Sequence, residues 1–428
     1  MRTGWKVAVL ALGCGVAGGS AAADWLDTLF PPGVPGYGAE PGVTVLSRLR
    51  PETQPEGVPA GAFILYPSWE QSLGYDSNVL GGAAPIGSWV IGTRPAALLS
   101  SGWSRDALGL YVAADDRQDL DAPAQSRTNW TASLGGSLDI GQDRLTLAAA
   151  HIDSHEDRTQ LDALPTDRPV PFQVDDLRAS FAWISGRWTV TPSLEASSWR
   201  YSATSILGVP ASQSYRDRTV LLGGATVSYE LAPQRTLVFV TRAIGQDYPY
   251  PSPGSSTLNS TGTQALGGFD YDDDAVWRYR LLLGAEHRDF AAAAYPARSA
   301  VIAEAEVAWT PSGLTTVIAT LTRSMEDAAQ EGVAGFINTT GKLTLDHELR
   351  RDLLLHASAV LQHADFLQGG SQQTSAVVSA GATWLVNRRV QLSATYDFTE
   401  QRGSGTTSPQ FSGNYTRGVA LLTLRLGL

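Results

Sequence analysis

The stretch Asn414 to Leu428, NYTRGVALLTLRLGL, decides the fold. Apolar and polar residues alternate along it. The apolar positions are Leu422, Leu424, Leu426 and Leu428, and Thr423 and Arg425 lie between them. This alternation predicts a β-strand with one apolar and one polar face. In an open soluble sheet, such a strand would be an apolar edge prone to aggregation, so it needs a partner strand. Closing a barrel against the first strand of the chain supplies one.

The overall composition also indicates transmembrane strands. Only 17% of the 428 residues are charged, yet no apolar run of about 18 residues occurs beyond the N-terminus, which excludes helical membrane spans. Strands that alternate between lipid and lumen produce this mixture. The formal net charge of −11 disfavours nucleic-acid binding, because that requires a basic surface.

Residues 1–23 have the pattern of a secretory signal peptide. Arg2 and Lys6 precede an apolar run, and three alanines at 21–23 form a cleavage site. The alternatives are a short buried helix or, because of Cys14, a lipoprotein signal, although the residues before Cys14 form a poor lipobox. Cys14 is the single cysteine, so cleavage would leave a chain without disulfides or thiolate chemistry.

Residues 24–60 are expected to be irregular, because prolines and glycines interrupt both helix and strand patterns there. The segment is either a flexible periplasmic lead or a segment that folds back into a lumen. We predict a Pro/Gly-rich periplasmic lead.

Residues 61–428 are predicted to form the barrel, an all-β, transmembrane, antiparallel, up-and-down fold. Segments of about 10 to 14 residues with alternating polarity recur between turn sequences. The 18 predicted strands are 63–75, 88–101, 104–115, 128–139, 144–155, 173–184, 187–200, 216–230, 235–246, 257–271, 275–288, 298–310, 314–325, 336–348, 353–365, 373–385, 389–401 and 414–427.

The connections between these strands alternate in length. Short links such as 141–143 and 185–186 follow even-numbered strands, and long ones such as 156–172, 201–215 and 247–256 follow odd-numbered strands. Short periplasmic turns opposite long extracellular loops are typical of outer-membrane barrels. A β-propeller or a sandwich would give turns of mixed length.

The two faces of the predicted strands differ in the same way. In 128–139 the apolar Trp130 and Leu134 oppose Thr131 and Ser133. No segment resembles a helix that could cover the apolar faces, so lipid is the expected partner. Aromatic residues gather at strand ends, as expected for rings at the headgroup level, the alternative being ordinary core packing.

The region from Val43 to Asn78 resembles a known family. It contains Arg50-Pro51-Glu52, then a Gly-x-Phe strand with Pro67 in its middle and Tyr75-Asp76-Ser77-Asn78 at its end. These features are similar to the putative beta-barrel porin 2 family of Gram-negative bacteria, and the barrel pattern extends the resemblance over residues 43–428. The resemblance implies an outer-membrane barrel with a poorly defined transport role, in some cases associated with surface polysaccharide. It implies no catalytic residues.

Charged side chains on the polar strand faces are the candidate site residues, as the lining of a lumen. The candidates are Arg278, Arg280, Glu286, Arg288, Glu304, Glu306, Asp176, Arg178, Lys342, Asp346 and Arg425. The strands that carry Arg278 and Glu304 are neighbours, so an Arg/Glu ladder can form across them. Opposed charges across a lumen order water and select solutes. The alternative is that these charges only pair with one another and solvate the wall.

Signals for catalysis are weak. His151 and His155 share a strand face but lie about 13 Å apart, too far to bind one metal ion. No Gly-x-Ser-x-Gly elbow occurs, and the acidic run 272–274 falls in a predicted tight turn. We therefore expect no enzyme, no catalytic or metal-binding residue and no cofactor.

The prediction is an 18-stranded barrel in the cell outer membrane that passes hydrophilic solutes. Loops 156–172 and 247–256 are its predicted constrictions or lids, and an 18-strand circumference admits an aqueous channel. The alternatives are a barrel that exports exopolysaccharide and a non-conducting structural or surface barrel. The expected partners are outer-membrane lipid, the barrel assembly machinery through the C-terminal strand, and a hydrophilic solute or polysaccharide.

Overall fold

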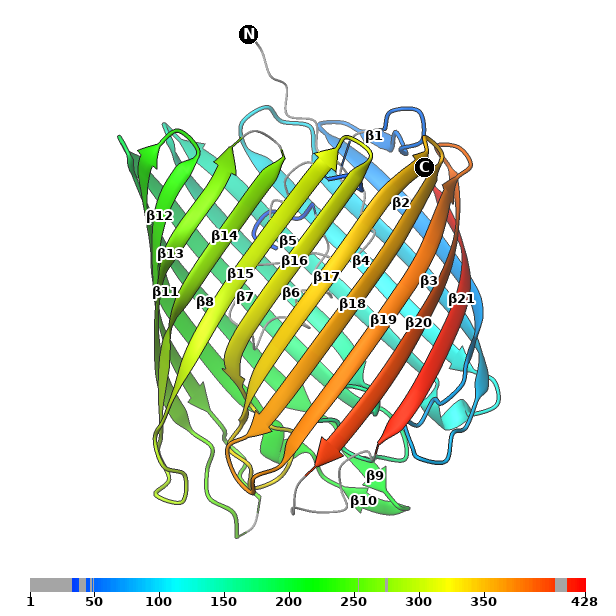
Figure 1. Cartoon of the computed structure of the whole chain (residues 1–428), viewed down its shortest axis with the longest axis vertical. Coiled ribbons are helices and arrows are strands. Elements are labelled where there is room, and N and C mark those ends of the chain that lie inside the picture. Colours follow the sequence, from blue (N-terminus) through cyan, green and yellow to red (C-terminus); the bar gives the residue numbers. More distant parts are fainter. Residues whose placement is uncertain are drawn as a thin grey trace.

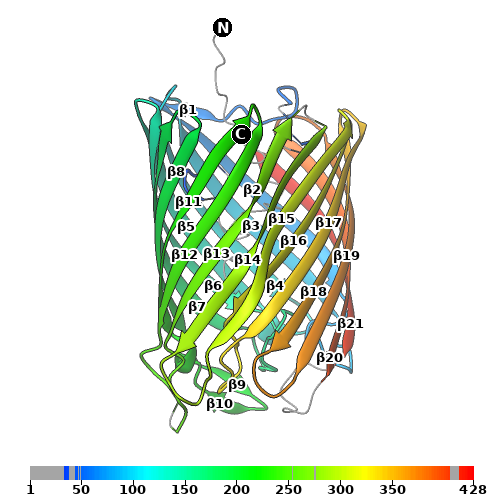
Figure 2. The same cartoon turned by 60° about the vertical axis from the view of Figure 1, so that its left-hand side comes forward.

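In a computed structural model the chain forms one closed antiparallel β-barrel (Figures 1 and 2). The structure describes residues 33–37, 44–46, 48, 50–252, 254–273, 276–404 and 414–428. The predicted signal peptide, residues 1–23, lies outside them. Among the described residues, no helix is long and apolar enough to cross a membrane.

Eighteen long strands make up the wall, in chain order around the barrel. They are β2 (Phe63–Asp76), β3 (Ser88–Ser101), β4 (Ala107–Asp119), β5 (Arg127–Ile140), β6 (Asp143–Glu156), β7 (Val170–Ser185), β8 (Trp188–Tyr201), β11 (Arg218–Ala232), β12 (Arg235–Asp247), β13 (Ser260–Asp273), β14 (Trp277–Phe290), β15 (Arg298–Ser312), β16 (Thr315–Glu326), β17 (Phe336–Arg350), β18 (Leu353–Phe366), β19 (Gln372–Leu385), β20 (Val390–Ser404) and β21 (Tyr415–Gly427). Each predicted strand corresponds to one of these, with its ends within four residues of the observed ends.

Three short strands and two 3-10 turns complete the described elements. β1 (Val58–Ala60) pairs with the beginning of β2, whereas β9 (Thr204–Ile206) and β10 (Val209–Ala211) form a hairpin in a long loop. The 3-10 turns are η2 (Pro123–Gln125) and η3 (Ser214–Arg216). The β9–β10 hairpin lies at the end of the barrel opposite β1 and the C-terminus (Figure 1).

The barrel closes between β2 and β21, as predicted from the C-terminal stretch. Their antiparallel register runs from Ser68 opposite Gly427 to Asp76 opposite Val419. β21 therefore ends before it reaches the first residues of β2. β1 pairs with that remaining edge, with Val58 opposite Leu65. The Gly57 N–H donates to the Leu428 carbonyl (3.2 Å), so β1 and β21 are joined end to end along the seam.

The two faces of the wall separate as the alternation predicts. Leu422, Leu424 and Leu426 of β21 are 59%, 36% and 43% exposed on the outer face. Aromatic rings pair across neighbouring strands at the ends of the outer face. The Trp277 and Trp309 rings stack 5.6 Å apart between their centroids. These rings have the arrangement of an interfacial girdle.

The seam allows little room for an added side chain. A Cβ at Gly74 of β2 would lie 2.0 Å from the Ala420 carbonyl oxygen of β21, whereas a Cβ at Gly341 of β17 would meet nothing within 4 Å. We predict that Gly74→Ala destabilises the barrel by about 1–3 kcal/mol through overpacking. Gly341→Ala is the matched control and should change stability far less. Both variants are heated, and the temperature at which each loses the gel mobility of the folded barrel is measured on denaturing gels. Equal midpoint temperatures for the two variants would contradict the close approach at the seam.

Candidate functional site

Charged side chains pair with one another on the inner face of β12 to β15. Arg278 of β14 pairs with Glu306 of β15 (3.4 Å). Glu304 pairs with Arg242 of β12 (2.7 Å), and Arg280 pairs with Asp270 of β13 (3.6 Å). Arg242 and Asp270 were not among the predicted lining residues. The same alternation places both on the inner face and could have identified them.

Glu286 and Arg288 lie in a buried network near the long-loop end. The Arg288 guanidinium contacts Glu286 (3.2 Å) and Asp327 (2.9 Å), and the Gln264 amide donates to Glu286 (3.0 Å). Glu286 and Arg288 are 0% and 3% exposed, so these charges are satisfied by one another and not by water. Asp327 follows the end of β16, where strand alternation gives no guidance.

The remaining predicted residues occupy separate parts of the inner wall. Asp176 pairs with Arg178 (3.0 Å), Asp346 contacts His356 Nδ1 (2.6 Å) and Arg425 pairs with Glu70 (3.5 Å). Lys342 faces inward on β17, opposite Thr320 and Val360. Within the described part of the chain, it has no carboxylate within 4.0 Å. The structure thus joins the predicted residues in several pairs and not in one cluster.

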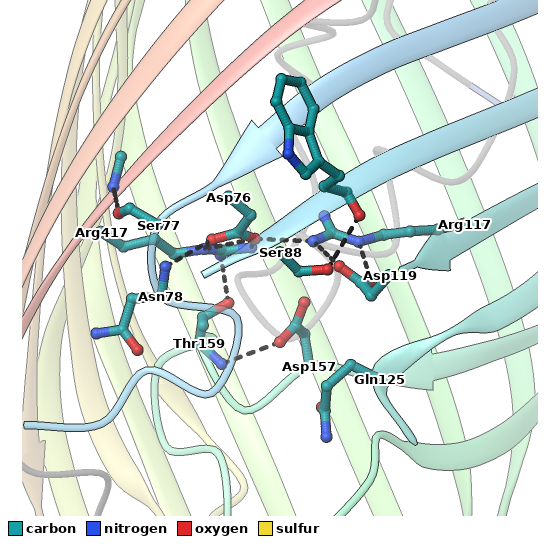
Figure 3. A network of polar contacts seen from close by, with 12 residues as sticks. Asp76, Ser77, Asn78, Ser88, Arg117, Asp119, Gln125, Asp157, Thr159 and Arg417 are labelled. Carbon is teal, nitrogen blue, oxygen red and sulfur yellow. Dashed lines mark hydrogen bonds and ion pairs between the residues drawn. The ribbon is translucent and has the colours of Figure 1, made fainter. Parts of the chain in front are cut away.

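A second buried network, which the sequence did not reveal, ties a loop to the seam. Asp76, at the end of β2, receives hydrogen bonds from Arg117 of β4 (2.8 Å) and Arg417 of β21 (2.5 Å). Figure 3 shows Asp76 between the two arginines, with Thr159 and Asp157 of the loop between β6 and β7 beside them. The Arg417 guanidinium also donates to the Thr159 hydroxyl (2.7 Å).

The loop of residues 157–169 reaches from β6 and β7 to a distant part of the wall. The Tyr415 hydroxyl of β21 donates to the Thr159 carbonyl (2.9 Å), and the Asp162 N–H donates to Gln373 Oε1 of β19 (2.8 Å). The Asp162 carboxylate accepts the Ala329 N–H from the loop after β16. The predicted loop 156–172 therefore lies across the barrel interior. In the other predicted constriction or lid, loop 247–256, the Tyr248 side chain is buried and the Tyr250 side chain is exposed.

Asp162 is an unusual carboxyl group. It is 5% exposed, and its φ of 61° lies in the left-handed region. Burial raises the pKa of Asp162 to about 8, because the Ala329 N–H and the more distant Arg216 only partly offset the loss of water. At neutral pH the docked loop therefore carries this carboxyl mainly in its protonated form.

The described residues of the N-terminal segment also dock on the inner wall. Val34 and Tyr37 are 1% and 2% exposed and belong to an apolar cluster of the wall. Its other buried members are Leu98, Ala148, Ala150, Ile152, Phe172, Val174 and Trp199. Nearer the short-turn end, Arg50 pairs with Glu348 (2.8 Å). Of the two alternatives for residues 24–60, the folded-back segment holds for these described residues, and a flexible lead does not.

Family comparison gives the barrel its place among known proteins. Residues 50–427 match the family described as Putative beta-barrel porin 2. The chain belongs to this family. The resemblance predicted from Val43 to Asn78 is thereby confirmed, and so is location in the outer membrane. No curated protein matches the chain.

Several solved structures are similar to the chain at low sequence identity. The outer membrane protein OpdK from Pseudomonas aeruginosa is 12% identical, with 85% of this chain and 99% of that chain covered and a TM-score of 0.45. OccK2 of the same organism is 13% identical, with 85% and 98% covered and a TM-score of 0.44. The ferric citrate transporter FecA is 9% identical, with 88% and 79% covered and a TM-score of 0.46. At TM-scores below 0.5, these likenesses say nothing specific about the lumen.

Asp76 can be tested as the anchor of loop 157–169. We predict that Asp76→Asn takes the carboxylate from Arg417 and leaves Arg117 with Asp119 alone, at a cost of roughly 3–5 kcal/mol for a broken buried pair. The loosened loop should then be cut by trypsin after the half-buried Arg158 several times faster than in the unchanged protein.

Asp116→Asn is the control for this experiment. Asp116 lies on the outer face of β4, where it accepts hydrogen bonds from Gln118 (2.9 Å) and Thr128 (2.6 Å). This variant should leave cleavage after Arg158 unchanged. Equal cleavage rates in the two variants would show that Asp76 does not hold the loop.

Proposed function

We propose that this porin-family barrel is a channel for small hydrophilic solutes, narrowed by two of its own segments. The observation that carries the proposal is the closed 18-strand wall, whose inner face is polar outside a few apolar clusters, with residues 33–37 and loop 157–169 lying inside it. A circumference of this size can enclose an aqueous channel. The inward segments set how much of that space a solute can use.

The inner wall of β16 to β19 supports passage of polar solutes. Hydroxyl side chains are frequent among its paired inward residues, and they include Thr316, Thr320, Thr322, Thr340, Thr344, Ser358, Ser375 and Ser379. Neutral donors and acceptors of this kind can replace the hydrogen bonds that a solute loses with water. Lys342 adds one positive charge to this part of the wall.

The β12 to β15 wall supports a different contribution to selection. Its arginines face carboxylates at 2.7 to 3.6 Å, so the ladder is close to neutral as a whole but strongly polar locally. Such a wall orders water and acts on the dipole of a solute. A small polar solute suits this lining better than a long polysaccharide, which must follow the whole length of the channel.

The remaining partners are proposed from chemistry alone. The outer leucines of β21 meet lipid, and we propose that this strand is also the segment read by the barrel assembly machinery. The short-turn end would then face the periplasm and the long-loop end the cell exterior.

Planar-bilayer recordings test the proposed channel. The purified barrel should give discrete conductance steps. Replacing residues 33–37 with a Gly-Ser linker of equal length should increase the step size, because Val34 and Tyr37 no longer occupy the lumen. The absence of conductance in both proteins would contradict the channel and favour a non-conducting surface barrel.

The pKa of Asp162 gives the channel a predicted pH dependence. The docked loop holds the proton up to about pH 8, whereas a released Asp loses it near pH 4. Docking therefore weakens as pH rises from about 4 to about 8, since the docked state binds more protons over that range. We expect larger or more frequent open steps at pH 8 than at pH 5.

Asp162→Asn should abolish this difference, because the amide stays neutral at both pH values. Asp365→Asn, at an exposed carboxylate of β18, is the control and should keep it. If Asp162→Asn retains the full pH dependence, Asp162 is not its source. The nearest other charged groups, Glu156 and Arg216, pair with each other (2.6 Å) and would be examined next.

A further inference from the structure

The side chain of Tyr37 occupies a pocket on the inner wall that matches the chemistry of its phenol. The Tyr37 hydroxyl donates to Asp176 Oδ1 of β7 (2.9 Å). The Arg178 guanidinium carbon lies 5.0 Å from the centre of the Tyr37 ring. The ring belongs to the apolar cluster that includes Ile152 of β6 and Val174 of β7. The hydroxyl and the ring of the phenol thus each have a suitable neighbour.

Asp176, Arg178, Ile152 and Val174 come from the barrel wall, whereas Val34 of the same apolar cluster belongs with Tyr37 to the N-terminal segment. Ala150 pairs with Asp176, and Ala148 pairs with Arg178, in the continuous register of β6 and β7. Arg178 is held in place by Asp176 (3.0 Å) and Glu195 of β8 (3.5 Å). The pocket would therefore keep its shape if Tyr37 left it.

Tyr37 itself is delivered by a short turn. Its N–H donates to the Val34 carbonyl (3.1 Å), and Gly33 and Gly36 have φ values of 100° and 87°. Burial and the adjacent Asp176 raise the pKa of Tyr37, so its hydroxyl remains a donor at any physiological pH. Residues 33–37 pair with no wall strand, so their displacement would leave the strand pairing intact.

We propose that this pocket is a recognition site for small phenols that enter the lumen, and that Tyr37 fills it in their absence. The proposal rests on the channel function proposed above and adds a class of solute to it. A phenol satisfies all three features together: the carboxylate accepts its hydroxyl hydrogen bond, the guanidinium lies over its ring, and the apolar cluster packs against its carbon atoms. A phenol that binds displaces the N-terminal turn and thereby widens the lumen.

The test compares two neutral probes, 4-hydroxyphenylacetamide and phenylacetamide, that differ by one hydroxyl group. Their affinities are measured by titration calorimetry with the detergent-solubilised full barrel and its Tyr37→Ala variant. We expect Tyr37→Ala to bind the phenol about tenfold more tightly than the unchanged protein, because no internal side chain competes. It should also prefer the phenol over phenylacetamide by about tenfold, as expected for one hydrogen bond to a charged acceptor.

A further substitution identifies the acceptor. Adding Asp176→Asn to Tyr37→Ala should remove most of the preference for the phenol, whereas adding Ser180→Ala, further along the same inner face, should not. Tyr37→Leu, which keeps an apolar side chain without a ring, replaces Tyr37→Ala if that variant does not fold.

Two results would overturn the proposal: equal affinity of the emptied pocket for both probes, or an Asp176→Asn variant with an unchanged preference. Because binding is measured in solution, its outcome is separate from conductance. A barrel that conducts without preferring the phenol contradicts only this inference. One that binds the phenol without conducting contradicts only the channel.

Discussion

In the hydrocarbon core of a membrane, every backbone N–H and C=O must find a partner within the protein, and a sheet satisfies this only when it has no free edge. The β2–β21 pairing removes the last edge of this sheet. Because β21 stops opposite Ser68, a piece of β2 would remain unpaired, and β1 covers it. The residues just before the barrel therefore belong to its closure. Everything inside the barrel depends on that ring being complete.

The closed ring encloses a space that the chain partly fills itself. An apolar area of the inner wall, unsuited to contact with water, is covered by Val34 and Tyr37. On the long-loop side, the buried Asp76 holds Arg417, which also donates to the Thr159 hydroxyl of the loop. Buried charges without partners would be costly, so these contacts fix the inward segments in place. Selection of solutes would then depend on when these segments move, as well as on the charges along the wall.

The wall could be predicted from the sequence, whereas the interior could not. A strand alternates with period two, so the local pattern revealed all 18 strands, the closing pair and facing charges such as Arg278 and Glu306. The Tyr37–Asp176 contact joins residues 139 positions apart, and Tyr37 lies in a segment with no period. The Asp76–Arg417 contact joins residues 341 positions apart at the ends of β2 and β21, where alternation gives the face of each side chain but not its partner. The Tyr75-Asp76-Ser77-Asn78 motif that signalled the family did contain one of these residues, but nothing in it indicated the arginine partners.

The most direct test of closure is a disulfide across the seam. The only cysteine is Cys14 in the predicted signal peptide, so an introduced pair has no competitor. The Ser72 and Thr423 hydroxyl oxygens lie 2.8 Å apart between β2 and β21. Ser72→Cys with Thr423→Cys should form a reducible disulfide, detected as a change in gel mobility of the denatured chain. The control is Ser393→Cys with Thr423→Cys in the β20–β21 pair, which should form a disulfide as well. A link in the second pair alone would mean that the barrel does not close at this seam.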